Sequence, residues 1–227
     1  MTMETQSVIR MFHVHKRYGS QIALRDINLN VLKNDFLFIS GQSGAGKTTL
    51  LRLLFLDERV SEGQILVNGI HLQRIRRAKI PFLRRNIGVV FQDFRLIHSY
   101  TVYENVALVL ETTGHQKGYI QKRVRQVLRM VGLEDRLHAH PPRLSGGEQQ
   151  RVAVARAAVG NPLILLADEP TGNLDMTAAD MVFDLFKQLH TRGTTVIVAT
   201  HDTRLFEKVQ GRIIVLNRGR LESQDHT

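Results

Sequence analysis

The sequence has no cysteine among its 227 residues, which excludes disulfide bonds and thiolate metal sites and suits a reducing compartment. Long apolar runs are also lacking. The longest, such as 163–167 and 195–199, have the length of strands, whereas a helix that crosses a bilayer needs about 20 apolar residues. Residues 1–7 contain no apolar segment of the kind found in signal peptides. These absences predict a soluble, cytoplasmic protein.

Acidic residues are in the minority, with 21 against 31 lysines and arginines, so the net charge is +10. Such an excess is compatible with nucleic-acid binding, with attraction to an anionic membrane, or with compensation for a polyphosphate ligand. The basic residues cluster at 74–79, 84–85 and 122–125. Because no aromatic residues are interleaved with them as platforms for stacking bases, we interpret these clusters as solvated faces beside an anionic partner surface.

Hydrophobic patterns predict the secondary structure. Strands are indicated by segments rich in β-branched and aromatic residues and by short apolar runs, and helices by apolar residues three to four apart. The predicted strands are 8–15, 22–31, 35–40, 64–68, 163–167 and 195–199. The predicted helices are 46–56, 102–112, 119–131, 148–159 and 177–190.

The order of these elements predicts an α/β fold. Apolar strands that alternate with helices indicate a parallel sheet covered on both faces. We expect one domain over residues 1–227, in which an α/β core with an N-terminal antiparallel β subdomain takes up about 8–91 and 161–221. A helical subdomain at about 92–160 is inserted into it. The polar ends, 1–7 and 222–227, are expected to be loose.

A glycine-rich loop connects the strand at 35–40 to the helix at 46–56. It reads Gly41-Gln-Ser-Gly-Ala-Gly-Lys47-Thr48 and fits the pattern G-x-x-x-x-G-K-[ST] in full. Glycines let the backbone approach phosphate oxygens, which the loop N–H groups and the helix N-terminus then bind. Lys47 can reach the β- and γ-phosphates, and the Thr48 hydroxyl can bind magnesium. The predicted nucleotide contacts of this segment are Gly41, Ser43, Gly44, Ala45, Gly46, Lys47, Thr48 and Thr49.

Two carboxylates, Asp168 and Glu169, end the apolar strand at 163–167. In parallel α/β sheets, ligands bind at the carboxyl ends of the strands. Asp168 is therefore a candidate for supporting magnesium, and Glu169 for polarising the attacking water as a general base. The alternative is a solvated acidic pair at the turn into Pro170, and the phosphate loop makes the functional interpretation the better one.

A second pair of glycines lies just before the helix at 148–159, in Leu144-Ser145-Gly146-Gly147-Glu148-Gln149-Gln150-Arg151. Ser145 is a favoured N-cap, and the glycines again allow close approach to a helix N-terminus. The pattern predicts a second anion site without a lysine of its own. Two such helix ends, only one of which has a lysine, indicate two subunits that complete each other's sites. A simple capped helix start, the alternative, does not require two successive glycines.

The segment 144–151 resembles the signature motif of ATP-binding-cassette (ABC) ATPases, and residues 9–221 follow that family's order of motifs. The resemblance implies a P-loop NTPase (RecA-like) core, ATP and Mg²⁺ as cofactors, hydrolysis to ADP and phosphate, and a homodimer that forms on ATP binding. It assigns Ser145, Gly146 and Gly147 to nucleotide binding.

The same resemblance implies roles for four residues that are less specific singly. Tyr18 is similar to the aromatic residue that stacks on adenine, and Asp175 belongs to a loop that crosses the dimer interface. Gln92 is similar to the glutamine that contacts magnesium and the nucleophilic water, and His201 to the switch histidine at the γ-phosphate. An ordinary turn aromatic and a strand-end histidine are the alternatives for Tyr18 and His201. The expected catalytic residues are thus Glu169, His201 and Gln92, and the metal ligands Thr48, Gln92 and Asp168.

Three stretches, 80–85 (IPFLRR), 88–93 (GVVFQD) and 101–107 (TVYENVA), resemble the cell-division subfamily of bacterial ABC cassettes. This implies an integral membrane partner, a place on the inner face of the cell membrane through that partner, and regulation of peptidoglycan hydrolases. Cassettes for lipoprotein release and macrolide export share much of the core, including 171–175, and are the alternative. Residues 54–59 depart from the usual pattern, in which a small residue or glycine is common.

An ABC ATPase that acts on nucleic acids is a rival from another class. The basic charge permits it, but the sequence has no long coiled-coil insertion, zinc module or second cassette, so we expect no nucleic-acid partner. A nucleotide-binding scaffold with little turnover is a third possibility, which Glu169 and His201 oppose.

An apolar run follows Gln92. We expect Phe94, Leu96, Ile97 and Tyr100 to line a groove for a short helix of the membrane partner, because a connecting segment should face solvent. The alternative is packing inside the helical subdomain, which is an equal expectation for Leu96.

Overall fold

The structure is a computed structural model that describes residues 6–226. The chain forms two compact units, one made of residues 1–84 and 195–227 and the other of residues 85–194. Strands dominate the first unit and helices the second. Among the described residues, no helix is both long and apolar enough to cross a bilayer.

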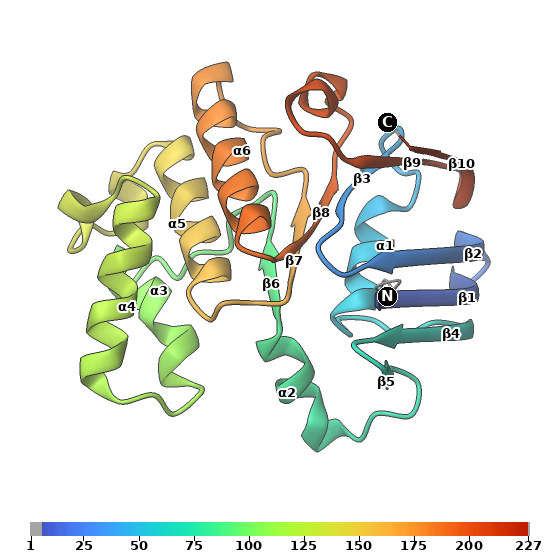
Figure 1. The fold of residues 1–227 in the computed structure, drawn as a ribbon, viewed down its shortest axis with the longest axis horizontal. Helices are drawn as coiled ribbons and strands as arrows, with labels where there is room; N and C mark the ends of the chain where they lie inside the picture. Colours follow the sequence, from blue (N-terminus) through green and yellow to red (C-terminus); the bar gives the residue numbers. More distant parts are fainter. Residues whose placement is uncertain (1–5, 227) are drawn as a thin grey trace, which may run out of the picture. The chain divides into compact units, whose positions relative to one another are not determined.

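An antiparallel sheet forms one part of the first unit (Figure 1). Its strands lie in the order β2-β1-β4-β5. Their bounds are β1 (Ser7–Tyr18), β2 (Gln21–Leu32), β4 (Glu62–Val67) and β5 (Ile70–His71). The apolar side chains of β1 that pack inward, such as Ile9, Met11 and Val14, are almost fully buried, whereas the polar residues between them are exposed. The N-terminal antiparallel sheet expected from the sequence is confirmed.

A parallel set of strands forms the rest of the first unit. Strand β3 (Phe36–Ser40) pairs in parallel with β8 (Thr195–Ala199) on one side and with β9 (Arg212–Asn217) on the other. Strand β10 (Arg220–His226) pairs antiparallel with β9. Leu37, Phe38 and Ile39 are fully buried, as a continuous apolar run in a central strand predicts. Three short helices complete the unit: α1 (Lys47–Leu54), η1 (Arg77–Lys79) and η4 (Thr203–Lys208).

Helix α2 (Ile80–Arg85) ends at the first residue of the second unit, where two parallel strands, β6 (Ile87–Val90) and β7 (Ile164–Asp168), lie side by side. The helices α3, α4 and α5 pack against one another, and α6 packs against α5. Their bounds are α3 (Val102–Glu111), α4 (Lys117–Met130), α5 (Gly146–Ala158) and α6 (Met176–Thr191), with the short turns η2 (Glu134–Arg136) and η3 (Pro141–Arg143).

The predicted strands and helices are all found, with ends that differ by a few residues. The expectation of loose ends is wrong where the structure describes them: β1 begins at Ser7, and β10 continues to His226 through backbone pairing with β9. Residues 1–5 and 227 lie outside the described residues. The second unit contains the expected helical segment 92–160 together with β6, β7 and α6, so the boundaries of a separate helical subdomain stay a prediction.

Candidate nucleotide site

The phosphate loop lies between β3 and α1 in the first unit. A Cβ atom on Gly41, whose φ is +150°, would lie 2.2 Å from the carbonyl oxygen of Leu216, so only glycine fits there. Helix α1 begins after Gly46, a cap residue that has no side chain to accept a hydrogen bond from the helix amides. The helix end is therefore built to bind an anion rather than to be capped from within.

Lys47 is the first residue of α1 and is only 5% exposed. Its Nζ donates hydrogen bonds to the carbonyl oxygens of Gly41, at 2.6 Å, and Gln42, at 3.2 Å. A buried ammonium requires such partners, and the loop carbonyls place its charge in the centre of the loop. Thr48, next in the chain, is exposed, as a magnesium ligand should be.

Tyr18, the expected adenine platform, is the last residue of β1 and is 42% exposed. Its hydroxyl is hydrogen-bonded to Glu58 and to Thr49. Lys16 lies with its Nζ 4.7 Å from the centre of the Tyr18 ring and 2.8 Å from the Glu58 carboxylate. These contacts fix the orientation of the ring. The contacts of Lys16 and Glu58 were not predicted from the sequence.

The charges around Tyr18 are reflected in two pKa values. Burial raises the pKa of the Tyr18 hydroxyl, and the hydrogen bond to Glu58 raises it further. Burial would also raise the pKa of Glu58, but hydrogen bonds from Lys16 and Tyr18 outweigh it and lower that pKa. Glu58 is therefore an ionised acceptor that holds both Lys16 and Tyr18 at neutral pH.

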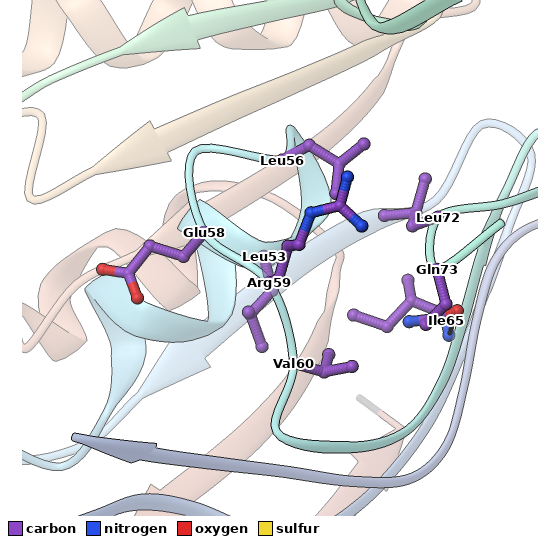
Figure 2. A pocket seen from close by; sticks show the side chains of 8 residues that line it. All are labelled: Leu53, Leu56, Glu58, Arg59, Val60, Ile65, Leu72 and Gln73. Carbon is purple, nitrogen blue, oxygen red and sulfur yellow. Dashed lines mark hydrogen bonds between the residues drawn. The ribbon is translucent and has the colours of Figure 1, made fainter. Parts of the chain in front are cut away.

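A hollow of about 230 Å³ lies beside the C-terminal end of α1 (Figure 2). It is lined by Leu53, Leu56, Glu58, Arg59, Val60, Ile65, Leu72 and Gln73. Most of these side chains are apolar, and the Glu58 carboxylate extends away from them. None of the eight is an expected site residue, so this hollow is a neighbour of the Tyr18 platform rather than the nucleotide site.

His201 follows β8 by two residues and is exposed. The segment is held on both sides of it. Before it, the amide of Thr200 donates to the carbonyl of Ile39 at 3.1 Å. After it, Asp202 caps η4 and pairs with Arg204 at 2.7 Å, and the hydrogen bond from Arg204 lowers the pKa of Asp202. Both neighbours restrict where His201 can lie.

In the second unit, β7 ends at Asp168, and both Asp168 and Glu169 are half-buried. Glu169 has φ +43°, in the left-handed region, where a residue with a side chain is strained by roughly 1–2 kcal/mol. Strain of this kind is frequent at functional residues. The left-handed conformation of Glu169 turns the chain sharply between the end of β7 and Pro170.

Gln92 lies beside the segment that follows Glu169. A Cβ on Gly172 would be 3.4 Å from Gln92 Nε2 and 3.9 Å from the Cβ of Glu169. Asn173 Nδ2 also donates to the carbonyl of Gln92 at 3.5 Å. The structure thus brings two of the expected catalytic residues, Gln92 and Glu169, to the same turn.

The signature motif begins helix α5. Ser145 is its N-cap, and its hydroxyl accepts from the amide of Glu148 at 3.2 Å, while the Glu148 carboxylate accepts from the amide of Ser145 at 2.8 Å. The hydrogen bond from the Ser145 backbone lowers the pKa of Glu148. Asp175 caps α6 in a similar way by accepting from the amide of Ala178 at 2.8 Å.

Sequence reasoning missed two side chains of α5. Gln150 is fully buried and donates to the carbonyl of Pro170 at 2.7 Å. Arg156 donates to the carbonyls of Phe94, at 2.7 Å, and Arg95, which both have positive φ. The partners of these two side chains are distant in sequence. The one sign of the buried hydrogen bonds in the sequence is that polar residues lie on the apolar face of the helix.

The expected site residues are thus distributed over both units. Tyr18, 41–49 and His201 belong to the first, and Gln92, 145–147, Asp168, Glu169 and Asp175 to the second. Among the side chains that the structure describes, no three from His, Cys, Asp or Glu form a group that could hold a metal ion.

The chain matches known proteins along most of its length. The family model described as "ABC transporter" matches residues 24–172. The cell division ATP-binding protein FtsE of Mycobacterium tuberculosis is 46% identical over 94% of this chain and 94% of the relative. FtsE of Escherichia coli is 44% identical over 94% and 97%, and FtsE of Streptococcus pneumoniae is 42% identical over 95% and 94%.

Solved structures agree with this relationship. A dimeric bacterial ABC transporter cassette superposes with a TM-score of 0.89 at 36% identity and covers 96% of this chain and 98% of its own. A dimeric ATP-binding cassette in a post-hydrolysis state, bound to ADP and phosphate, has a TM-score of 0.88 with the same identity and coverage. The expected P-loop NTPase fold and the resemblance to cell-division cassettes are confirmed, and the chain belongs to the ABC transporter family as an ATP-hydrolysing cassette related to FtsE.

Proposed function

We propose that this chain is the ATPase subunit of an FtsEX-type membrane complex, in which ATP-driven pairing of two copies sends a signal through an FtsX-like integral membrane protein during cell division. The observation that carries the ATPase part is the glycine-rich loop before α1, whose carbonyl oxygens hold the buried ammonium of Lys47 at the start of that helix. The names shared by relatives at 42–46% identity support the cell-division part.

The proposed cycle starts when the α1 amides, Lys47 and Thr48 bind the phosphates of ATP and Tyr18 stacks on the adenine. Ser145 and Gly147 of a second copy then close on the γ-phosphate. Glu169 accepts a proton from the attacking water, with His201 at the γ-phosphate and Gln92 at the water. Loss of phosphate removes the contact between the copies, and the pair reopens.

The residues expected to bind magnesium fit that ion. Thr48, Gln92 and Asp168 offer a hydroxyl, an amide carbonyl and a carboxylate, which are the oxygen ligands that Mg²⁺ prefers. Bound there with ATP, the ion would neutralise charge on the β- and γ-phosphates.

The Glu169→Gln variant tests the proposed chemistry. The amide has the same shape but accepts no proton from water, so ATP should still bind while hydrolysis falls by about 100-fold or more. We expect size-exclusion chromatography with ATP and Mg²⁺ to show a stable dimer of the variant and a transient one of the unchanged protein. Hydrolysis at the normal rate would exclude Glu169 as the base.

The segment after Gln92 supports the proposed membrane partner. Leu96 is buried, whereas Ile97 and Tyr100 are 37% and 38% exposed. The side-chain amide of Asn105 accepts from the amide of Ile97 and donates to the carbonyls of Ile97 and Tyr100, at 2.8–3.2 Å. This loop therefore presents apolar side chains to solvent from a fixed backbone, as a docking surface requires.

Co-purification tests the docking surface. A Phe94→Asp/Tyr100→Asp variant should lose co-purification with an FtsX-like protein from solubilised membranes, while ATP affinity stays unchanged. Leu163→Asp, an exposed apolar residue at a distance in sequence, is the matched control. If the double variant still co-purifies, this loop is not the docking surface.

A further inference from the structure

We propose that Gln150 links the two ATP sites of the dimer, by coupling the start of α5 to the turn that orients Glu169. This inference rests on the proposed function, in which the start of α5 in one copy contacts the γ-phosphate bound by the other. Gln150 is then a positioning residue for Glu169, and it reports the state of the partner's nucleotide to the catalytic base of its own site.

The first support is the hydrogen bond itself. Gln150 lies one helical turn after Gly146 and Gly147, and its Nε2 donates to the carbonyl of Pro170 at 2.7 Å. Gln150 is 0% exposed and Pro170 is buried, so water does not compete for this bond. A hydrogen bond in such surroundings is stronger and more directional than one at the surface.

The second support is the strain next to this bond. Glu169, with φ +43°, directly precedes Pro170, and such a conformation persists only where surrounding contacts enforce it. Gln150 binds the carbonyl that follows the strained residue. Weakening this bond allows the turn to relax, and relaxation moves the Glu169 carboxylate away from the position that accepts a proton from water.

The third support is the cost of burying the Gln150 amide. Its Oε1 is buried and has no hydrogen-bond partner among the residues that the structure describes. An unsatisfied buried oxygen destabilises the fold, and an apolar side chain of the same shape, such as methionine, would avoid this cost. The position therefore uses glutamine for the one bond that its Nε2 donates.

The fourth support is the close packing of the two segments at the start of α5. A Cβ on Gly147 would lie 2.8 Å from the Cβ of Ala178 in α6, and one on Gly146 would lie 3.8 Å from the carbonyl of Asn173. The start of α5 therefore has little space to move without displacing residues 169–178. A shift of α5 toward a γ-phosphate changes the Glu169 turn through this packing and through Gln150, and coupling of this kind acts in both directions.

The test compares the ATP dependence of hydrolysis in Gln150→Met and in the unchanged protein. In the unchanged protein we expect cooperative hydrolysis, with a Hill coefficient approaching about 2, the number of sites. In Gln150→Met it should fall to about 1, and kcat should fall by roughly ten- to a hundredfold because Glu169 is displaced. The affinity for ATP at concentrations where the chain is monomeric should not change.

Gln149→Met is the matched control. Gln149 is the neighbouring glutamine on α5, and its Nε2 donates to the carbonyl of Leu144 at 3.1 Å, away from the Glu169 turn. This variant should keep the Hill coefficient of the unchanged protein. An equal loss of cooperativity in both variants would overturn the inference, because it would show a general effect on the start of α5.

The Gln150→Glu variant tests the pH dependence of cooperativity, which a merely structural role of this residue would not change. It also tests the inference if Gln150→Met does not fold. An ionised carboxylate donates no hydrogen bond to Pro170, but a protonated one does, and burial raises the pKa of a carboxyl group. Cooperativity should thus be lost at pH 8 and partly restored towards pH 6. No such recovery, or a lower kcat with an unchanged Hill coefficient, would overturn the link.

The failures of the two proposals can be distinguished. If the unchanged protein does not hydrolyse ATP, the proposed function fails. If it hydrolyses ATP with a Hill coefficient of about 1, its two sites are independent, and only the coupling through Gln150 is overturned.

Discussion

Two helices of this chain begin at a glycine-rich motif, and their N-termini are built differently. Helix α1 begins after Gly46, with no side-chain cap and with Lys47 as its first residue. Helix α5 begins after Ser145, and the side chains of Ser145 and Glu148 satisfy two amides at its start. The first end thus has a cap residue without a side chain and adds a positive charge, whereas the second satisfies part of its own amides and adds a negative charge.

The difference explains why one chain holds only half of each proposed site. A phosphate at α1 would meet the positive end of the helix dipole and the Lys47 cation. A phosphate at α5 competes with the Ser145 hydroxyl and approaches the Glu148 carboxylate. Such an end gains from a γ-phosphate only when the rest of the nucleotide is anchored elsewhere, and in the proposed dimer the phosphate loop of a second copy is that anchor.

The largest expected effect separates the two helix ends directly. Lys47→Ala should weaken ATP binding by about 100-fold, since it removes a charged hydrogen-bond donor to the phosphates. Ser145→Ala should leave the affinity of the monomer within about twofold and instead reduce dimer formation with ATP. Calorimetry at low protein concentration measures the affinity, and light scattering measures the dimer. An equal loss of affinity in both variants would contradict the comparison.

The next effect concerns the two glycines of α5. Gly147→Ala should lower the free energy of unfolding by about 1–3 kcal/mol, because its Cβ would lie 2.8 Å from the Cβ of Ala178. Gly146→Ala, where the nearest atom is 3.8 Å away, should raise it by about 0.5–1 kcal/mol through helix propensity. Urea denaturation of both variants measures the difference. If their stabilities change alike, α5 is not packed as closely as we infer.

The proposed adenine platform, Tyr18, belongs to the same unit as α1, and a change beside it should have a smaller effect. Glu58→Gln replaces an ionised acceptor of Lys16 and Tyr18, so the Tyr18 ring should be less fixed and ATP affinity should fall by about three- to tenfold. Inorganic tripolyphosphate, which has no base, should bind as before. Glu62→Gln, which removes the exposed pair with Arg17, is the control and should change neither affinity. Equal weakening of both ligands would show that Glu58 acts on the phosphate loop instead.

The sequence predicted those parts of the molecule that depend on neighbouring residues. The phosphate loop, the Ser145 cap and the apolar strands at 163–167 and 195–199 are local patterns, and each was found where expected. Strand β6 was missed because four residues carry little periodicity. Strand β9 was missed although Ile213, Ile214, Val215 and Leu216 form an apolar run before a turn, which could have been interpreted as a strand.

Contacts between distant residues could not be predicted in this way. Gln150 and its partner Pro170 are 20 positions apart, and Arg156 and Phe94 are 62 apart. Nothing in one sequence shows which buried carbonyl a glutamine or arginine will meet, because folding of the whole unit decides it. The roles of the individual site residues also remain predictions, since they depend on a nucleotide and a second copy.

The smallest effect tests the negative charge at the start of α5. The hydrogen bond from the Ser145 backbone lowers the pKa of Glu148, so its ionised form stabilises the fold at pH values above the unfolded pKa. That contribution, about 0.3–1 kcal/mol for a charge at a helix end, is lost as the pH falls through the lowered pKa. Glu148→Gln should therefore be slightly less stable than the unchanged protein at pH 7, and the difference should vanish in acid.

The same substitution should favour pairing, because it removes a carboxylate from the approach of the γ-phosphate while an amide oxygen still accepts from Ser145. We expect the ATP concentration that gives half-maximal dimer to fall by about two- to threefold, as a charge at a helix end implies. Glu104→Gln changes the same kind of cap at the start of α3, with Thr101 in place of Ser145, and should leave dimer formation unaltered. If Glu148→Gln weakens the ATP-dependent dimer, then Glu148 assists the partner's nucleotide, and the second helix end is a stronger anion site than its cap implies.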